Sequence, residues 1–131
     1  MNRRTFLTVA LSTLTTLSAT AQTRTDWSRW KRLGSRRVDL GVDRDVIPCG
    51  FSGFLRAIVL EVRGSAVNFL DVKLVLGNGE VVDVPMRSLV KAGERSRIID
   101  LPGNKRVVNR VELLYRPARG RRAEVVAWGL E

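Results

Sequence analysis

The chain has 131 residues, with 23 Lys and Arg against 13 Asp and Glu, and a formal net charge of +10 at pH 7. It has no histidine and one cysteine, which excludes histidine-based catalysis, histidine-ligated metal sites and an intramolecular disulfide. Its length suits one domain rather than two.

The first predicted element is an export signal over residues 1–21. Arg3 and Arg4 precede an uncharged stretch, and Ala19 and Ala21 form the small-x-small pattern that a signal peptidase accepts. Ser and Thr dilute this stretch too much for a membrane anchor, which needs about 20 strongly apolar residues. We expect removal of the signal to leave a periplasmic or secreted protein without a transmembrane anchor. Its net charge falls from +10 to +8, because the two arginines leave with the signal.

The pattern Arg-Arg-x-Phe-Leu over residues 3–7 resembles the core of the twin-arginine signal, a receptor-read address. Asn2 and Thr8 depart from the residues usual in that signal. The resemblance implies export by the twin-arginine route, with the general secretory route as the alternative. A buried N-terminal helix is the structural alternative for the same residues.

Residues 22–29 are expected to form a flexible lead-in, and residues 30–131 a single domain. Trp27 and Trp30 are spaced for one helical turn, but we favour a short strand that begins near Trp30 and is broken at Gly34.

Apolar side chains alternate with period two along the rest of the domain. Strands are expected over residues 36–42, 51–63, 67–76, 80–85, 95–101, 107–115 and 122–130, and a loop with one helical turn over residues 86–93. Gly77-Asn78-Gly79 gives the strongest hairpin signal. About seven to nine short strands predict an all-β fold, an antiparallel β-sandwich of jelly-roll or Greek-key type, with a compact barrel as the alternative.

Several short sequence motifs of the domain, taken together, resemble those of a known family. They cover residues 33–34, 43–47, 77–79, 99–103, 106–107, 111–115 and 128–129. Together they resemble a family of small exported bacterial proteins classed only as a domain of unknown function. The resemblance covers nearly all of residues 30–130. It implies a β-sandwich, no established activity and no catalytic residues to transfer.

Arginine clusters and two tryptophans are the candidate binding residues. They are Trp27, Trp30, Arg32, Arg36, Arg37, Arg116, Arg119, Arg121 and Arg122, and Lys105, Arg106 and Arg110 form a further basic group. Arginine forks bind phosphate or carboxylate, and tryptophan can stack on a sugar ring. If the clusters converge, they form a docking face for an anionic polymer or surface. The alternative is that the tryptophans seal one end of the sandwich and the arginines are merely solvated.

Other chemistry has weaker support. Asp43 and Asp45 are a weak candidate metal site, but the rest of a calcium loop is absent, which favours a salt bridge or turn cap. Cys49 is expected to be a buried small hydrophobe. No cofactor is expected, and no nucleophile elbow accompanies the serines.

We therefore predict a non-enzymatic cell-envelope protein that binds an anionic or glycan partner. High positive charge usually indicates nucleic acid, but export directs the prediction to lipid headgroups, lipopolysaccharide, cell-wall polymers or acidic proteins. One alternative is an accessory subunit that binds another envelope protein through a sheet edge. Another is a small hydrolase, which requires two or more carboxylates converging in a pocket. The oligomeric state is left open.

Overall fold

A computed structural model describes residues 26–39, 44–103, 105–118 and 121–131. The predicted signal residues Arg3, Arg4, Ala19 and Ala21, and the candidates Asp43 and Arg119, lie outside the described residues. Within those ranges, no helix has the length and apolar character needed to cross a membrane.

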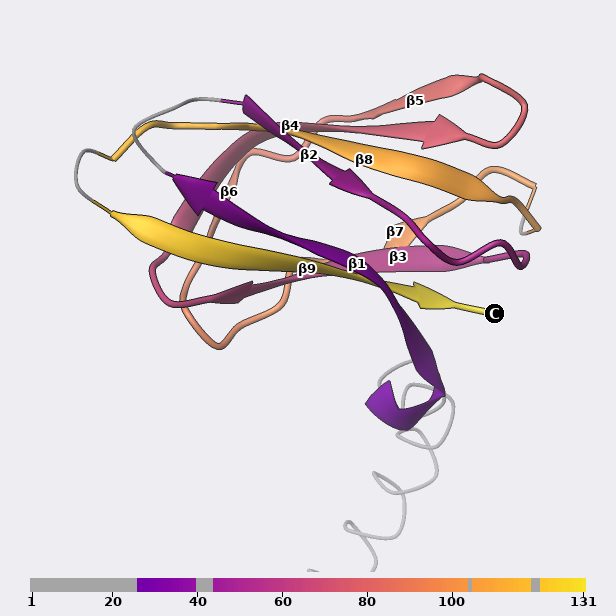
Figure 1. The fold of residues 1–131 in the computed structure, drawn as a ribbon, viewed down its shortest axis with the longest axis horizontal. Coiled ribbons are helices and arrows are strands. Elements are labelled where there is room, and N and C mark those ends of the chain that lie inside the picture. Colours follow the sequence, from indigo (N-terminus) through magenta and orange to yellow (C-terminus); the bar gives the residue numbers. More distant parts are fainter. Residues whose placement is uncertain (1–25, 40–43, 104, 119–120) are drawn as a thin grey trace, which may run out of the picture.

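The described residues form nine strands preceded by one short 3-10 turn (Figure 1). The turn η1 spans Trp27–Arg29. The strands are β1 (Trp30–Asp39), β2 (Arg44–Pro48), β3 (Ala57–Arg63), β4 (Val67–Leu76), β5 (Val81–Val84), β6 (Ser88–Val90), β7 (Ile99–Asp100), β8 (Val108–Tyr115) and β9 (Arg122–Leu130).

The strands form two antiparallel sheets that stack as two layers (Figure 1). Sheet A has the strand order β1-β9-β3-β7 and sheet B the order β2-β8-β4-β5, while β6 pairs with β4 on the same edge as β5. The chain crosses from one sheet to the other after every strand except β4 and β5, since β4, β5 and β6 all belong to sheet B, and this is the winding of a jelly roll. The predicted antiparallel β-sandwich is confirmed.

The core lies between the inner faces of the two sheets, where alternate residues of each strand point. Its largest fully buried side chains include Tyr115, Phe69, Ile58, Leu60 and Leu74. Each such side chain stabilises the fold by about 1.5–3 kcal/mol through removal from water. The Tyr115 hydroxyl donates a hydrogen bond to the backbone carbonyl of Asp39, 3.4 Å away, so its polar end is also satisfied.

Sheet A also buries part of its outer face. Val59 of β3 and Val126 of β9 point away from sheet B, yet neither has exposed surface. Trp30, Ala57, Val59 and Leu130 form a second, smaller apolar cluster, against which Trp27 and Trp128 pack. The turn η1 thus forms part of the cover on this side of the sheet.

Two predictions about individual elements are wrong, and the strand β2 was not predicted. Gly34 does not break the first strand, since β1 continues to Asp39 with a register shift between Arg32 and Gly34. Residues 44–48 form the paired strand β2, and residues 88–90 form β6 instead of part of a loop with a helical turn.

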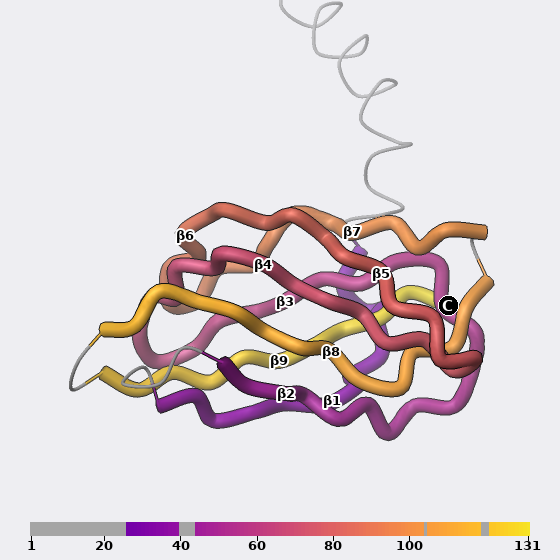
Figure 2. Tube along the Cα trace, turned by 90° about the horizontal axis from the view of Figure 1, so that it is seen from above, coloured from indigo at the N-terminus to yellow at the C-terminus, as the bar shows by residue number. Residues whose placement is uncertain are grey.

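The shift at Gly34 lets β1 and β2 lie side by side along one long side of the sandwich (Figure 2). The Gly50 N–H donates to the Leu33 carbonyl at 2.9 Å, and Arg36 pairs with Asp45 at 2.7 Å. A Cβ at residue 34 would overlap the carbonyl oxygen of Pro48. We call this junction the β1–β2 seam.

Gly34→Ala is expected to lower the free energy of unfolding by about 1–3 kcal/mol, because the added methyl forces the seam apart. Urea unfolding followed by circular dichroism measures the change. Gly50→Ala is the matched control, since its nearest contact, the Leu33 carbonyl oxygen, is 4.0 Å away. Equal stability of the Gly34 variant and the control would show that the seam can open without cost.

Cys49 follows β2 and is half-buried against the core. Burial raises the pKa of its thiol to about 11. The thiol is therefore protonated at about pH 8, and we expect iodoacetamide to modify the folded protein far more slowly than the urea-unfolded protein. Mass spectrometry after a timed reaction measures both rates, and equal rates would contradict the burial.

Candidate functional site

The outer face of sheet A carries many of the arginine and tryptophan residues that the sequence indicates as candidate binding residues. We call this surface the sheet-A face. It comprises Trp27, Trp30, Arg32, Ser35, Arg37, Asp39, Glu61, Arg63, Arg95, Arg122, Glu124 and Trp128. The register of β1, β9 and β3 aligns these side chains in rows that run across the three strands. Arg37, Glu124 and Arg63 form one row. Arg32, Trp128 and Val59 form another row further along the strands.

Glu61 lies at the centre of the sheet-A face and organises its neighbours. Its side chain is only 12% exposed. One carboxylate oxygen accepts hydrogen bonds from Trp128 Nε1 at 3.0 Å and Arg63 Nη2 at 3.1 Å, and the other lies 4.0 Å from Arg95 Nη2. A largely buried carboxylate needs such partners, so Glu61 fixes one indole and two guanidinium groups in place.

The tryptophans continue from this centre towards η1. The rings of Trp27 and Trp30 are 5.2 Å apart and tilted by 44°, and the Arg95 guanidinium lies 4.3 Å from the centre of the Trp27 ring. Trp30 is 4% exposed and belongs to the outer apolar cluster of sheet A. Trp27 and Trp128 are half-buried and keep part of their indole surface accessible.

The turn that carries Trp27 is capped by Asp26. The Asp26 carboxylate accepts hydrogen bonds from the hydroxyl and the backbone N–H of Ser28, which lower the pKa of Asp26. This cap fixes the start of η1 and with it the position of Trp27.

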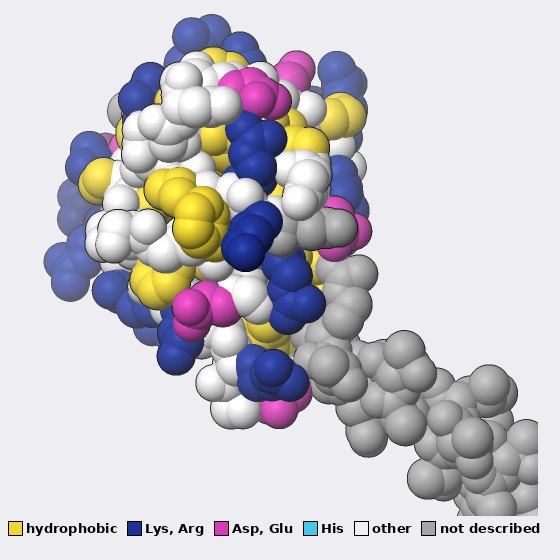
Figure 3. Space-filling model, turned by 90° about the vertical axis from the view of Figure 1, so that its right-hand side faces the viewer, with side chains coloured by type: hydrophobic (Ala, Val, Ile, Leu, Met, Phe, Trp, Pro, Cys, Tyr) yellow, Lys and Arg dark blue, Asp and Glu magenta, His cyan; other side chains and the backbone are white. Residues whose placement is uncertain are grey.

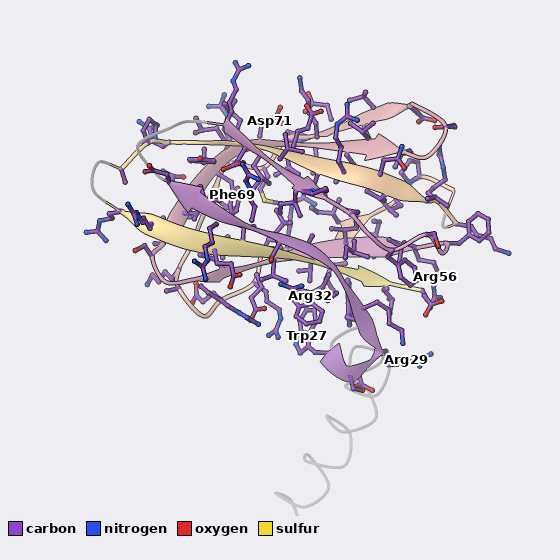
Figure 4. All side chains as sticks on the ribbon, viewed as in Figure 1. Trp27, Arg29, Arg32, Arg56, Phe69 and Asp71 are labelled. Carbon is purple, nitrogen blue, oxygen red and sulfur yellow. The ribbon has the colours of Figure 1, made fainter. Side chains whose placement is uncertain are left out.

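The structure brings together some of the predicted binding residues and separates others. Trp27, Trp30, Arg32, Arg37 and Arg122 all belong to the sheet-A face, and Figure 4 shows Trp27 and Arg32 on the same side of sheet A. The remaining described candidates lie elsewhere. Arg36 pairs with Asp45 across the β1–β2 seam, Arg116 follows β8 in sheet B, and Arg121 is exposed just before β9.

Several arginines of the sheet-A face are available to a ligand. Arg32 donates to the Ser35 hydroxyl at 2.6 Å, while neither Arg37 nor Arg122 forms an ion pair with any other described residue. Arg37, Arg63 and Arg122 line a shallow hollow of about 510 Å³ at one end of the face. From Arg122 to Trp128 the face extends roughly 20 Å, at the usual rise per residue of a strand.

Sequence reasoning missed Glu61, Arg63, Arg95 and Trp128. Glu61 and Arg63 lie in a predicted strand, where charges at alternate positions of an apolar run point to one face. Arg95 reaches the face through an isolated bridge to Glu61. Glu61 and Arg95 are far apart in the sequence, so no local sequence pattern predicts their pairing.

Sheet B carries a second hollow, a shallow groove of about 620 Å³. Arg44, Asp71, Lys73, Glu112 and Leu114 are among its lining residues. Burial, followed by the hydrogen bond and charge of the neighbouring Asp83, raises the pKa of Asp71. Asp71 lines the groove, whereas Asp83 does not, so the hydrolase alternative stays a prediction.

The described part of the chain has no group of three or more Asp, Glu, His or Cys side chains that could hold a metal ion. Asp45, one half of the weak metal candidate, is engaged with the Arg36 guanidinium and the Val46 N–H.

Asp71→Asn is expected to stabilise the protein at about pH 7. The fold raises the pKa of Asp71 above its ordinary value of 3.8, so ionised Asp71 disfavours folding, and this penalty disappears as the pH falls below 3.8. Urea unfolding at about pH 7 and about pH 3 should show a gain that shrinks on acidification. Glu131→Gln, an exposed carboxylate at the chain end, should show no such gain, and a gain in the Asp71 variant that does not change with pH would contradict the assignment.

The sequence profile of a family described as "Domain of unknown function (DUF2541)" matches residues 6–129. No curated protein has significant sequence similarity to the chain.

Solved structures with a similar course of the chain include AlgX of Pseudomonas aeruginosa, at 15% identity and a TM-score of 0.53 over 77% of this chain. The match covers 27% of the AlgX chain, so this chain spans about a quarter of it. At this identity, the likeness shows a common fold only. Others are CBM29_1, a family 29 carbohydrate-binding module of Piromyces equi (14% identity, 79% of this chain, 82% of that chain, TM-score 0.46), and the SPBc2 prophage-derived protein YomS (13% identity, 78% and 91%, TM-score 0.44).

Proposed function

We propose, from the premise that the chain belongs to the family described as Domain of unknown function (DUF2541), that it is an exported, non-enzymatic module that binds an acidic polysaccharide of the cell envelope on its sheet-A face. The observation that carries this proposal is the convergence of five arginines and two partly exposed indoles on that face. The twin-arginine-like signal at residues 3–7 supports export.

Charge supports an anionic partner. Arg32, Arg37, Arg63, Arg95 and Arg122 outnumber Asp39, Glu61 and Glu124 on the sheet-A face, so these residues carry a net charge of +2. Guanidinium groups pair with carboxylates and sulfates through two parallel hydrogen bonds. Because Glu61 already holds Arg63 and Arg95, less side-chain entropy is lost when a ligand binds them.

The shape of the surface supports a polymer. The arginines follow rows of a sheet over roughly 20 Å, which suits an extended chain better than a compact ligand. Trp27 and Trp128 offer indole surface beside these rows, and aromatic rings pack against the C–H faces of sugars.

A sugar polymer fits this face better than a lipid bilayer does. Membrane-binding surfaces insert exposed apolar side chains, but Trp30 is buried here. The exposed large hydrophobic residues of the described chain, Val46, Phe54, Val81 and Leu89, lie outside the sheet-A face.

The alternative of an accessory subunit requires a sheet edge that can pair with a partner strand, and the edges of this sandwich do not favour such pairing. β5, β6 and β7 are four, three and two residues long, too short to add a partner strand of ordinary length. The edge strands β1 and β2 lie against each other at the seam.

The double variant Arg37→Gln/Arg122→Gln is expected to bind polygalacturonate about fivefold or more weakly, because two unpaired cations leave the face. Isothermal titration at about 0.05 M and about 0.5 M NaCl should also show weaker binding of the wild type at high salt. Arg44→Gln/Arg110→Gln, with the same change in charge on sheet B, is the matched control. An equal loss in both variants, or none in the first, would contradict the assignment to the sheet-A face.

A further inference from the structure

A second candidate site lies at the end of the sandwich, around Phe54. Phe54 is 57% exposed and is the only aromatic side chain among the exposed large hydrophobic residues of the described chain. The ammonium of Lys105 lies 5.7 Å from the centre of its ring. Because the Phe54 ring is exposed to solvent beside the Lys105 ammonium, it does not contribute to the hydrophobic core.

The backbone holds Phe54 and Lys105 next to each other. The adjacent residues Leu55 and Arg106 form an isolated antiparallel bridge, with N–H···O distances of 2.7 and 2.9 Å in the two directions. Leu55 is buried, so the alternation of side chains turns Phe54 outward. A Cβ at residue 53 would lie 2.7 Å from the outer edge of the Phe51 ring, which would then have to shift.

Polar groups complete a shallow hollow of about 470 Å³ beside the ring. Phe54, Asn78, Lys105, Arg106 and Asn109 line it. Asn78 Oδ1 accepts the Glu80 N–H at 3.0 Å. The Asn78 amide also donates towards the Glu80 carboxylate, which leaves one of its two N–H bonds for a ligand. Arg106 is held by Glu80 at 2.9 Å, and this hydrogen bond lowers the pKa of Glu80.

We propose that this hollow, the loop-end site, binds a single sugar ring that carries an anionic group. The C–H face of the ring packs on Phe54, its hydroxyls bind the amides of Asn78 and Asn109, and its anionic group pairs with Lys105. Figure 3 looks onto this end of the molecule and shows hydrophobic side chains bordered by Lys and Arg.

The inference rests on the proposed function for its class of ligand, an acidic glycan, but not for its location. The loop-end site takes one residue of the glycan, whereas the sheet-A face takes an extended segment. An anionic group could be a carboxylate or a phosphate, since Lys105 recognises either as a point charge.

Titration of the full chain with D-glucuronate, D-glucose 6-phosphate and D-glucose, followed by ¹H–¹⁵N NMR, tests the site. The two anionic sugars should shift the side-chain amide signals of Asn78 and Asn109, and their relative affinities identify the preferred group. Glucose should bind at least about fivefold more weakly, because it cannot pair with Lys105. No shift at these amides with either anionic sugar would overturn the proposal.

Phe54→Ala should weaken binding of the preferred sugar about tenfold, and Lys105→Gln should remove the preference over glucose. Leu89→Ala is the matched control, because Leu89 is 56% exposed but lies on β6. Unchanged affinity in the Phe54 variant, or an equal loss in the control, would overturn the site.

Polygalacturonate separates the two proposals. If Arg37→Gln/Arg122→Gln weakens polymer binding while Phe54→Ala leaves both polymer and glucuronate binding intact, the sheet-A proposal stands and the loop-end site fails. If Phe54→Ala alone weakens both, the loop-end site stands and the sheet-A proposal fails.

Discussion

The rest of the structure depends on one constraint: sheet A must keep water from both of its faces around β3 and β9. Sheet B covers the inner face. On the outer face Val59 and Val126 are fully buried, so η1 and the tryptophans have to lie over this side of the sheet. This cover encloses the Glu61 carboxylate, which then requires donors and draws in Trp128, Arg63 and Arg95. The ordered arginines of the candidate face thus follow from the apolar residues beneath them.

The two proposed sites use the jelly roll in different ways. The sheet-A face relies on cross-strand register, which sets Arg37 beside Glu124 and Arg63 although the three residues lie on three strands. The loop-end site relies on the segments between strands, where the Leu55–Arg106 bridge fixes Phe54 and Lys105. A sheet face offers a long, flat surface, and a sandwich end offers a small hollow with backbone held by its neighbours. The two proposals therefore place a polymer and one of its residues in separate parts of the same fold.

Much of the fold could be predicted because the long strands alternate strongly. β4 was predicted with its observed bounds, Val67 to Leu76, and β9 with its bounds, Arg122 to Leu130. β2 was missed because Ile47 is its only fully buried side chain, so pairing with β8 rather than a hydrophobic pattern defines it. The sequence indicated Trp27, Trp30 and the arginines as binding residues, but it could not show that Arg36 turns to Asp45 while Arg37 joins the sheet-A face. That difference arises from the register shift at Gly34, a tertiary feature.

The placement of the tryptophans has a spectroscopic consequence. All three tryptophans of the sequence, Trp27, Trp30 and Trp128, lie on the sheet-A face, and Tyr115 is enclosed in the core. Intrinsic ultraviolet emission of the described domain therefore originates almost wholly from that one face. The aromatic side chain of the loop-end site is a phenylalanine, whose emission is negligible beside that of an indole. Tryptophan fluorescence is therefore sensitive to the docking of η1 and to a ligand on the sheet-A face. It is insensitive to a ligand at the loop-end site.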